Sequence, residues 1–214
     1  TVVTIDLPGH GVSGMDRDEW DMVALGADVR SVVGHLGLDR VILIGHSMGG
    51  PVALEAAALM PEKTVGAIGV DALHDVTFEY EQDQIDAMVT GFETDFAGSM
   101  VQFVGGMFHE GADPALIEDI TANMSEGPPQ IGAALIAEFG DYDHEGAMAA
   151  VAVPVRSINA DLWPTDIEAN RAVHADYDAV VIPGVGHFLM MESPDVFNKA
   201  LEEVVASLVG ADSE

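Results

Sequence analysis

The fold is decided by residues 41–50, which read Val-Ile-Leu-Ile-Gly-His-Ser-Met-Gly-Gly. Four consecutive apolar residues predict a strand that is buried on both faces. The turn Gly45-x-Ser47-x-Gly49 follows, and residues 51–60 have the pattern of a helix. A strand, a sharp turn and a helix together predict a nucleophile elbow, in which a strained serine holds its hydroxyl clear of the strand.

The residue types around Ser47 suit that geometry. Bulk two residues before or after the serine is expected to clash, and glycine occupies both places, Gly45 and Gly49. The following helix aims its N-terminal N–H groups at the point where negative charge would develop. Ser47 is therefore the candidate nucleophile.

Two further motifs accompany this turn. Residues 6–13 read Asp-Leu-Pro-Gly-His-Gly-Val-Ser, and residues 181–188 read Val-Ile-Pro-Gly-Val-Gly-His-Phe. Together with the serine turn, and in this order, they resemble motifs of the α/β-hydrolase family. The first resembles the loop after that family's fourth strand, and the second resembles the strand-eight segment that delivers its catalytic histidine. The resemblance implies a mostly parallel, doubly wound α/β sheet with a helical cap inserted after strand six.

Strands alternate with helices along the chain, which independently favours a parallel sheet covered on both faces. Strands are expected at residues 1–5, 41–44, 65–70, 151–158 and 179–182, and helices at 18–36, 51–60, 167–174 and 194–209. Residues 73–150 show no clear strand, but Phe and Met recur there at helical spacing. We therefore expect residues 1–72 and 151–214 to form the core and residues 73–150 to form the cap, partly lining an apolar pocket.

Four candidate side chains directly follow predicted strands: Ser47, Asp71, Asp161 and His187. Because parallel strands carry their sites at their carboxyl ends, these residues should meet at one edge of the sheet. A serine hydroxyl needs a base within hydrogen-bond reach, and the resemblance gives that role to His187. The expected chemistry is acyl transfer through Ser47, with the N–H group of Met48 in the oxyanion hole.

The acid that orients the histidine has two candidates. Most of the family carries it after strand seven, but there Trp163 occupies the expected position and Asp161 lies two residues early. Other members supply it after strand six, where Asp71 stands. The two-residue offset would redirect a loop side chain, which slightly favours Asp71, and Asp166 is a more distant third candidate.

The family's second oxyanion donor comes from a loop after strand three. That loop should precede Thr1, so the sequence is expected to lack roughly the first three strands of the family. In the family's strand order, strand three lies between the segments that Thr1–Ile5 and Val41–Ile44 resemble. We therefore expect no direct ladder hydrogen bonds between these two segments.

Composition limits the other function classes. With 214 residues, 49% hydrophobic, the chain can bury one sizeable core, and it contains no cysteine. The histidines are scattered, so we expect no metal and no cofactor.

Acidic residues number 37 against 7 basic ones, and the net charge of −30 argues against nucleic acid or an anionic membrane as a partner. Acidic residues throughout the chain and only two lysines suggest adaptation to high salt. No secretory signal or membrane-length apolar run is visible, and we expect a cytoplasmic protein.

The leading interpretation is a serine hydrolase of carboxylic esters, acting on small to medium apolar substrates. A lactonase, a C–C bond hydrolase, a cofactor-free haloperoxidase or an acyltransferase would use the same residues. A non-catalytic binding protein on a hydrolase scaffold is the alternative from a different class.

Overall fold

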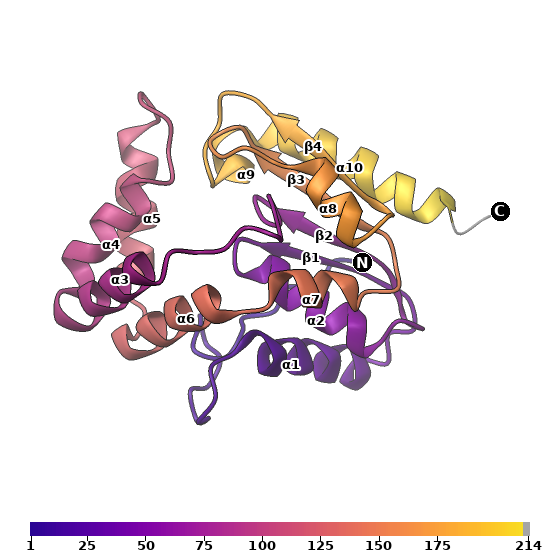
Figure 1. The fold of residues 1–214 in the computed structure, drawn as a ribbon, viewed down its shortest axis with the longest axis horizontal. Coiled ribbons are helices and arrows are strands. Elements are labelled where there is room, and N and C mark those ends of the chain that lie inside the picture. The colour runs from indigo at the N-terminus through magenta and orange to yellow at the C-terminus, as the bar shows by residue number, and fades with distance from the viewer. Residues whose placement is uncertain (212–214) are drawn as a thin grey trace.

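The computed structural model describes residues 1–211, which contain a single parallel sheet of four strands in the order β1-β2-β3-β4 (Figure 1). The strands are β1 Val41–His46, β2 Thr64–Val70, β3 Val155–Ala160 and β4 Tyr177–Ile182. Ile44 is in register with Ile68, and Ile158 is in register with Val180. The parallel α/β architecture expected from the sequence is confirmed.

Helices cover both faces of the sheet. One face carries α1 Met22–His35, α2 Gly49–Leu59, α7 His144–Ala149 and α8 Ile167–Val173, and the other carries α9 Leu189–Glu192 and α10 Pro194–Ala211. The first helix begins where the Asp21 carboxylate caps the N–H of Ala24, and it ends before Gly37, whose φ of +63° suits glycine. Within residues 1–211, no helix is long and apolar enough to cross a bilayer.

The core follows the two faces of the sheet. Leu54 and Ala67 belong to the cluster beneath α2, together with the fully buried Tyr177. Ile68 and Ile158 point to the other face, where Leu208 of α10 packs on them. Alternate residues of β2 thus serve opposite layers, as the two-residue period of a strand requires.

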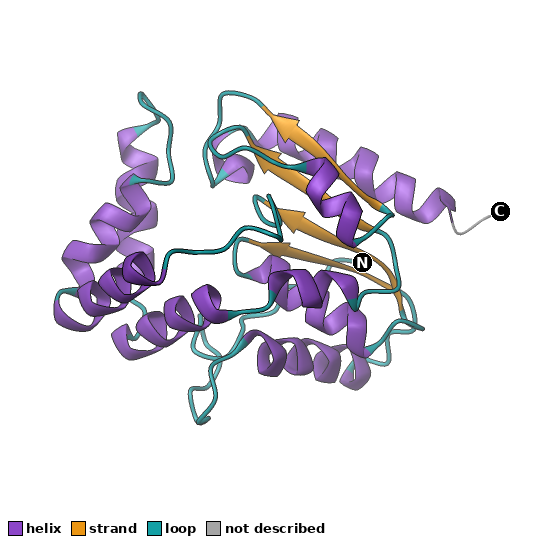
Figure 2. Cartoon of the chain, in the orientation of Figure 1, coloured by secondary structure: helices purple, strands orange, loops and turns teal. Residues whose placement is uncertain are grey.

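Four helices between β2 and β3 lie beyond the ends of the strands. They are α3 Gln82–Thr94, α4 Phe96–Gly105, α5 Pro114–Ser125 and α6 Pro129–Asp141. The strand arrowheads in Figure 2 point toward this side of the molecule. These helices share a core that contains Phe92, Met100 and Val104. The all-helical character expected for this region is therefore observed, while its role as a separate cap stays a prediction.

The strand predicted at Thr1–Ile5 is wrong. This segment has no regular structure, its side chains are exposed, and Val2 is 89% exposed. A β-branched run forms a strand only where another strand offers backbone partners. Within residues 1–211, β1 is an edge strand, and no ladder joins it to Thr1–Ile5, as expected.

Candidate active site

Ser47 sits in a strained turn directly after β1. Its φ of +54° lies in the left-handed region that non-glycine residues rarely adopt. The Ser47 N–H still donates to the carbonyl of Val70 at 3.0 Å, so the ladder with β2 fixes the residue at the end of its strand. Strain of this kind costs on the order of 1–3 kcal/mol and tends to mark functional sites.

The glycines around Ser47 that have no room for a side chain differ in part from those that the sequence predicts. A Cβ on Gly45 would overlap the carbonyl group of Gly49, so Gly45 is required by the tight turn. A Cβ on Gly49 would meet nothing within 4 Å, and the expected clash at that position is wrong. The second close approach is instead at Gly50, where a Cβ would lie 2.7 Å from the Cβ of Ala72.

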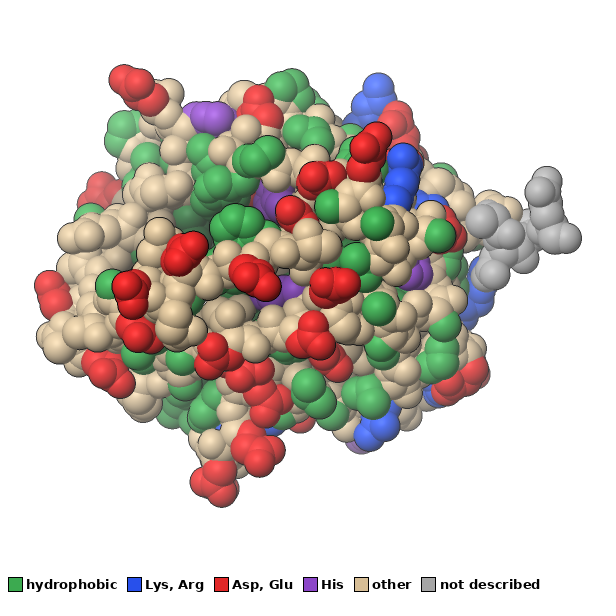
Figure 3. Space-filling model, viewed as in Figure 1, with side chains coloured by type: hydrophobic (Ala, Val, Ile, Leu, Met, Phe, Trp, Pro, Cys, Tyr) green, Lys and Arg blue, Asp and Glu red, His purple; other side chains and the backbone are tan. Residues whose placement is uncertain are grey.

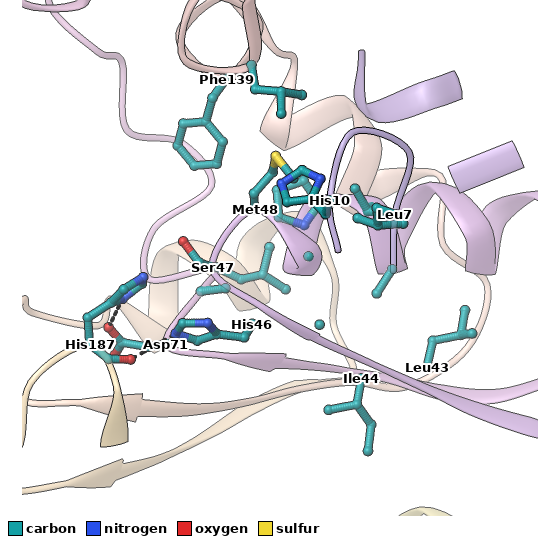
Figure 4. Close-up of a pocket in the computed structure, with 18 of the residues that line it drawn as sticks. Leu7, His10, Leu43, Ile44, His46, Ser47, Met48, Asp71, Phe139 and His187 are labelled. Carbon is teal, nitrogen blue, oxygen red and sulfur yellow. Dashed lines mark hydrogen bonds and ion pairs between the residues drawn. The ribbon is translucent and has the colours of Figure 1, made fainter. Parts of the chain in front are cut away.

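His187 and Asp71 form a buried pair beside Ser47. The Nδ1 atom of His187 lies 2.6 Å from Oδ2 of Asp71, and the two residues are only 4% and 2% exposed. Figure 4 shows this hydrogen bond on the same side of the pocket as the Ser47 hydroxyl. The pairing keeps a proton on Nδ1, which donates to the carboxylate, and leaves Nε2 of His187 available to a neighbouring group.

Asp71 is held from several sides. Its Oδ1 atom accepts a hydrogen bond from the N–H of Ala160 at 2.7 Å, and its own N–H donates to the carbonyl of Ile158 at 2.9 Å. The His74 Nε2 lies 3.5 Å from Oδ1. Burial alone would raise the pKa of Asp71, but the hydrogen bond from His187, the nearby His74 and the Ala160 N–H lower it well below its usual range. Asp71 is therefore ionised at neutral pH.

Asp161 faces a different histidine. Its Oδ1 atom accepts hydrogen bonds from the N–H of Gly184 and from Nε2 of His109, both at 2.9 Å. The Gly184 N–H first and then His109 lower the pKa of this exposed carboxyl. Asp166, the third candidate, caps α8 through the N–H of Ala169. The structure thus brings Asp71 to His187 and engages Asp161 elsewhere, while the catalytic role of either carboxylate stays a prediction.

The loop that carries His187 is anchored to the helical region. The N–H of His187 donates to the carbonyl of Met107 at 2.8 Å. Gly186 is needed here, because a Cβ would collide with that same carbonyl. The Phe188 ring stacks on Phe108 with centroids 5.4 Å apart. The segment between α4 and α5 therefore helps to fix the position of the imidazole.

His46 is a site residue that the sequence analysis missed. Its Nε2 donates to the backbone carbonyl of His187 at 2.9 Å, and the two ring centroids are 4.5 Å apart. Burial first, and then the nearby His187, lower the pKa of His46 to about 4, so the ring is neutral near pH 7. Its position beside Ser47 was the only available signal, because its partner lies 141 residues away in the sequence.

A cleft of about 3,000 Å³ extends from these residues along the open edge of β1, where Ile42, Leu201 and Val205 also line it. Ser47, Met48 and His187 line its floor. The helical region contributes an apolar wall made of Met88, Phe92, Phe96, Met100, Phe103 and Phe139. Met48 immediately precedes α2 and adopts helical backbone angles. Its N–H group thus belongs to the first turn of a helix, where anions are stabilised, although its oxyanion role stays a prediction.

Comparison with known proteins places this geometry in a family. The family model described as the alpha/beta hydrolase family matches residues 1–200. The chain belongs to the alpha/beta hydrolase family. Membership explains why a strained serine, a histidine loop and a carboxylate stand at the carboxyl ends of parallel strands.

Individual proteins resemble the chain at modest identity. A dihydrolipoyllysine-residue acetyltransferase component of the acetoin cleaving system of Pseudomonas putida is 26% identical over 94% of this chain, which spans 55% of that relative's length. A 2-(acetamidomethylene)succinate hydrolase of Mesorhizobium japonicum is 25% identical, over 96% of this chain and 78% of the relative. The structure of a thermophilic esterase from Thermogutta terrifontis superposes with a TM-score of 0.78 at 24% identity, covering 94% of this chain and 78% of that one.

Proposed function

We propose that the protein is a serine hydrolase that cleaves carboxylic esters of small to medium apolar substrates through an acyl-enzyme on Ser47. The observation that carries the proposal is the buried 2.6 Å hydrogen bond between His187 Nδ1 and Asp71 beside a serine with φ of +54°. A structural histidine does not require a strained serine next to it, and a strained serine does not require an oriented base. Their coincidence in one cleft is the arrangement that nucleophilic catalysis needs.

The proposed steps follow from the atoms present. Nε2 of His187 takes the proton of the Ser47 hydroxyl as the oxygen attacks the ester carbonyl, and Asp71 stabilises the imidazolium that forms. The N–H of Met48 donates to the oxyanion. His187 then returns the proton to the leaving alcohol, and water cleaves the acyl-enzyme by the same sequence of proton transfers.

The helical region is proposed to act as a cap that supplies the acyl pocket. Most of its cleft-lining side chains are aliphatic, aromatic or thioether groups, with Gln84, Asn123 and Glu126 among the exceptions, and this apolar majority favours an apolar acyl chain over a sugar or a nucleotide. Fold likeness alone does not separate an esterase from a lactonase, a C–C hydrolase, an acyltransferase or a binding protein.

Hydrolysis of a p-nitrophenyl ester series by the wild-type protein and by Ser47→Ala tests the proposal. We expect turnover by the wild type and none above background by the variant, with unchanged thermal stability, because a strained serine contributes little packing. A lactone panel run in parallel separates the two ester classes. Turnover by Ser47→Ala near the wild-type rate would end the serine-hydrolase interpretation.

A further inference from the structure

The basic residues of this protein are few and lie away from the candidate site. Of the seven Lys and Arg residues in the sequence, only Arg40 lines the cleft. Arg40 precedes β1 and Ser47 follows it, so the rise of a strand separates them by roughly 20 Å. That separation exceeds the Debye length of about 8 Å at physiological ionic strength, so Arg40 has little electrostatic effect at Ser47.

Three other cations gather at the amino ends of the strands. Lys63 precedes β2 and lies 3.6 Å from Asp39. The guanidinium of Arg156 contacts Asp176, which immediately precedes β4, and Arg171 bonds to Asp178 near the start of the same strand. On the face drawn in Figure 3, most of the blue side chains lie over the right-hand side, opposite the direction of the strand arrowheads in Figure 2.

The remaining cations also belong to outer surfaces. Arg17 is paired with Asp28 and lies over the ring of Trp20, and Lys199 lies 3.9 Å from Glu203 on α10. Arg30 is an exposed residue of α1. None of these side chains lines the cleft.

Carboxylates, in contrast, border the cleft. Besides the buried Asp71, five carboxylates line it, and all but Asp75 are exposed: Asp6, Asp75, Glu126, Asp166 and Glu168. Among the cleft histidines, burial lowers the pKa of both His46 and His144, so these rings are uncharged near pH 7. The exposed His10 also lines the cleft, beside Met48, with Nδ1 3.1 Å from the carbonyl oxygen of Pro8 (Figure 4). His74 already faces the carboxylate of Asp71. A substrate carboxylate would therefore meet repulsion at the rim and an apolar wall inside, without a Lys or Arg partner among residues 1–211.

We propose that the cleft selects uncharged acyl groups and discriminates against acyl groups that carry a carboxylate. The inference rests on the serine-hydrolase function proposed above and narrows its substrate class. Burying an unpaired carboxylate against Met and Phe side chains is strongly unfavourable. Encounter is slowed as well, because a field of one sign in a cleft changes association rates by about 10–10³-fold at low salt.

Three esters with the same leaving group test the proposal. They are p-nitrophenyl hexanoate, mono-p-nitrophenyl adipate and p-nitrophenyl methyl adipate. The far end of the acyl chain is a methyl group in the first, a carboxylate in the second and a neutral methyl ester in the third. We expect kcat/KM for the adipate to be about tenfold or more below that for its methyl ester at low salt. Molar salt should narrow this difference, because the Debye length then falls to about 3 Å.

A charge reversal at the rim provides a matched variant. Glu126 is an exposed residue after the end of α5, and Glu202 is an exposed residue of α10 outside the cleft. Glu126→Lys should raise the ratio of kcat/KM for the adipate to kcat/KM for its methyl ester several-fold, whereas Glu202→Lys, with the same change in net charge, should leave that ratio at the wild-type value.

The outcomes separate the two proposals. If the adipate is hydrolysed as efficiently as its methyl ester at low salt, charge selection is overturned and the serine-hydrolase function stands. If Glu126→Lys and Glu202→Lys change the adipate rate equally, the local rim charge is not responsible and the inference also fails. Absence of turnover with all three esters would contradict the proposed function and, with it, the inference that rests on it.

Discussion

The orientation of the His187 imidazole depends most on the carboxylate of Asp71. The backbone of β3 fixes it through the Ile158 carbonyl and the Ala160 N–H, so its second oxygen is presented to His187. Sequence reasoning left Asp71 and Asp161 almost equal because both follow a strand. The structure distinguishes the two carboxylates, because Asp161 bonds to His109 and to the N–H of Gly184, whereas Asp71 bonds to His187.

Exchange of each carboxylate for an amide should show this difference. Asp71→Asn would hold the His187 imidazole in the wrong tautomer, and we expect kcat to fall by about 10⁴-fold. Asp161→Asn removes an exposed contact to His109 and should change kcat little. Steady-state kinetics on one ester, with a melting curve for each variant, measures both effects. A larger loss in Asp161→Asn would assign the acid to that residue.

His46 should make folding stability depend on pH. Its pKa is about 6.5 in the unfolded chain and about 4 in the folded protein. Between those values the unfolded chain binds more protons, so stability falls as the pH drops from about 6.5 to about 4, by at most about 3 kcal/mol for this group. Asp71 contributes only toward the lower end of this window, because the unfolded carboxyl, with a pKa of 3.8, begins to bind protons below about pH 5 while the folded one stays ionised.

His46→Gln isolates that contribution, because a glutamine amide can donate to the same His187 carbonyl without titrating. Urea unfolding at a series of pH values should give a flatter profile for the variant than for the wild type between pH 6.5 and 4. Parallel profiles would show that His46 keeps an ordinary pKa in the folded protein.

At the scale of elements, local sequence patterns predicted turns and helix ends, but they did not predict which distant segments pair with each other. The elbow after β1 and the end of α1 before Gly37 depend on residues within a few positions of each other, and the sequence predicted both. Thr1–Ile5 has the β-branched composition of a strand and forms none, because a strand needs a partner that composition does not specify. The contact between Met107 and His187 likewise joins segments far apart in the chain.

Two alanine substitutions distinguish the glycines of the elbow. Gly45→Ala would drive a Cβ into the Gly49 carbonyl, so we expect loss of activity together with a lower melting temperature. Gly49→Ala places its methyl group in open space in the first turn of α2, where alanine also has the better helix propensity. It should melt at or above the wild-type temperature. A stability loss in Gly49→Ala equal to that in Gly45→Ala would show that the turn is tighter than described.

For the whole molecule, the governing feature is a net charge of −30 on 214 residues. Acidic side chains are spread over the face shown in Figure 3, so self-repulsion acts across that face. Counterions screen that repulsion. We propose on this basis that the protein is adapted to high salt.

Thermal unfolding in increasing salt tests this adaptation. The melting temperature should rise from low salt to molar potassium chloride, and most of the rise should occur at the lower concentrations, where added ions shorten the Debye length most. Sodium chloride serves as the control for a potassium-specific effect. A melting temperature that is flat across the series would identify an ordinary acidic protein.

The central claim is that Ser47 is a nucleophile activated by His187, and covalent labelling tests it most directly. The protein is incubated with a fluorophosphonate probe, and the adduct is located by mass spectrometry of the intact chain and of its peptides. We predict one adduct per chain, on Ser47, absent in Ser47→Ala and strongly slowed in His187→Ala. An unlabelled wild-type protein, or an adduct on another residue, would contradict the claim.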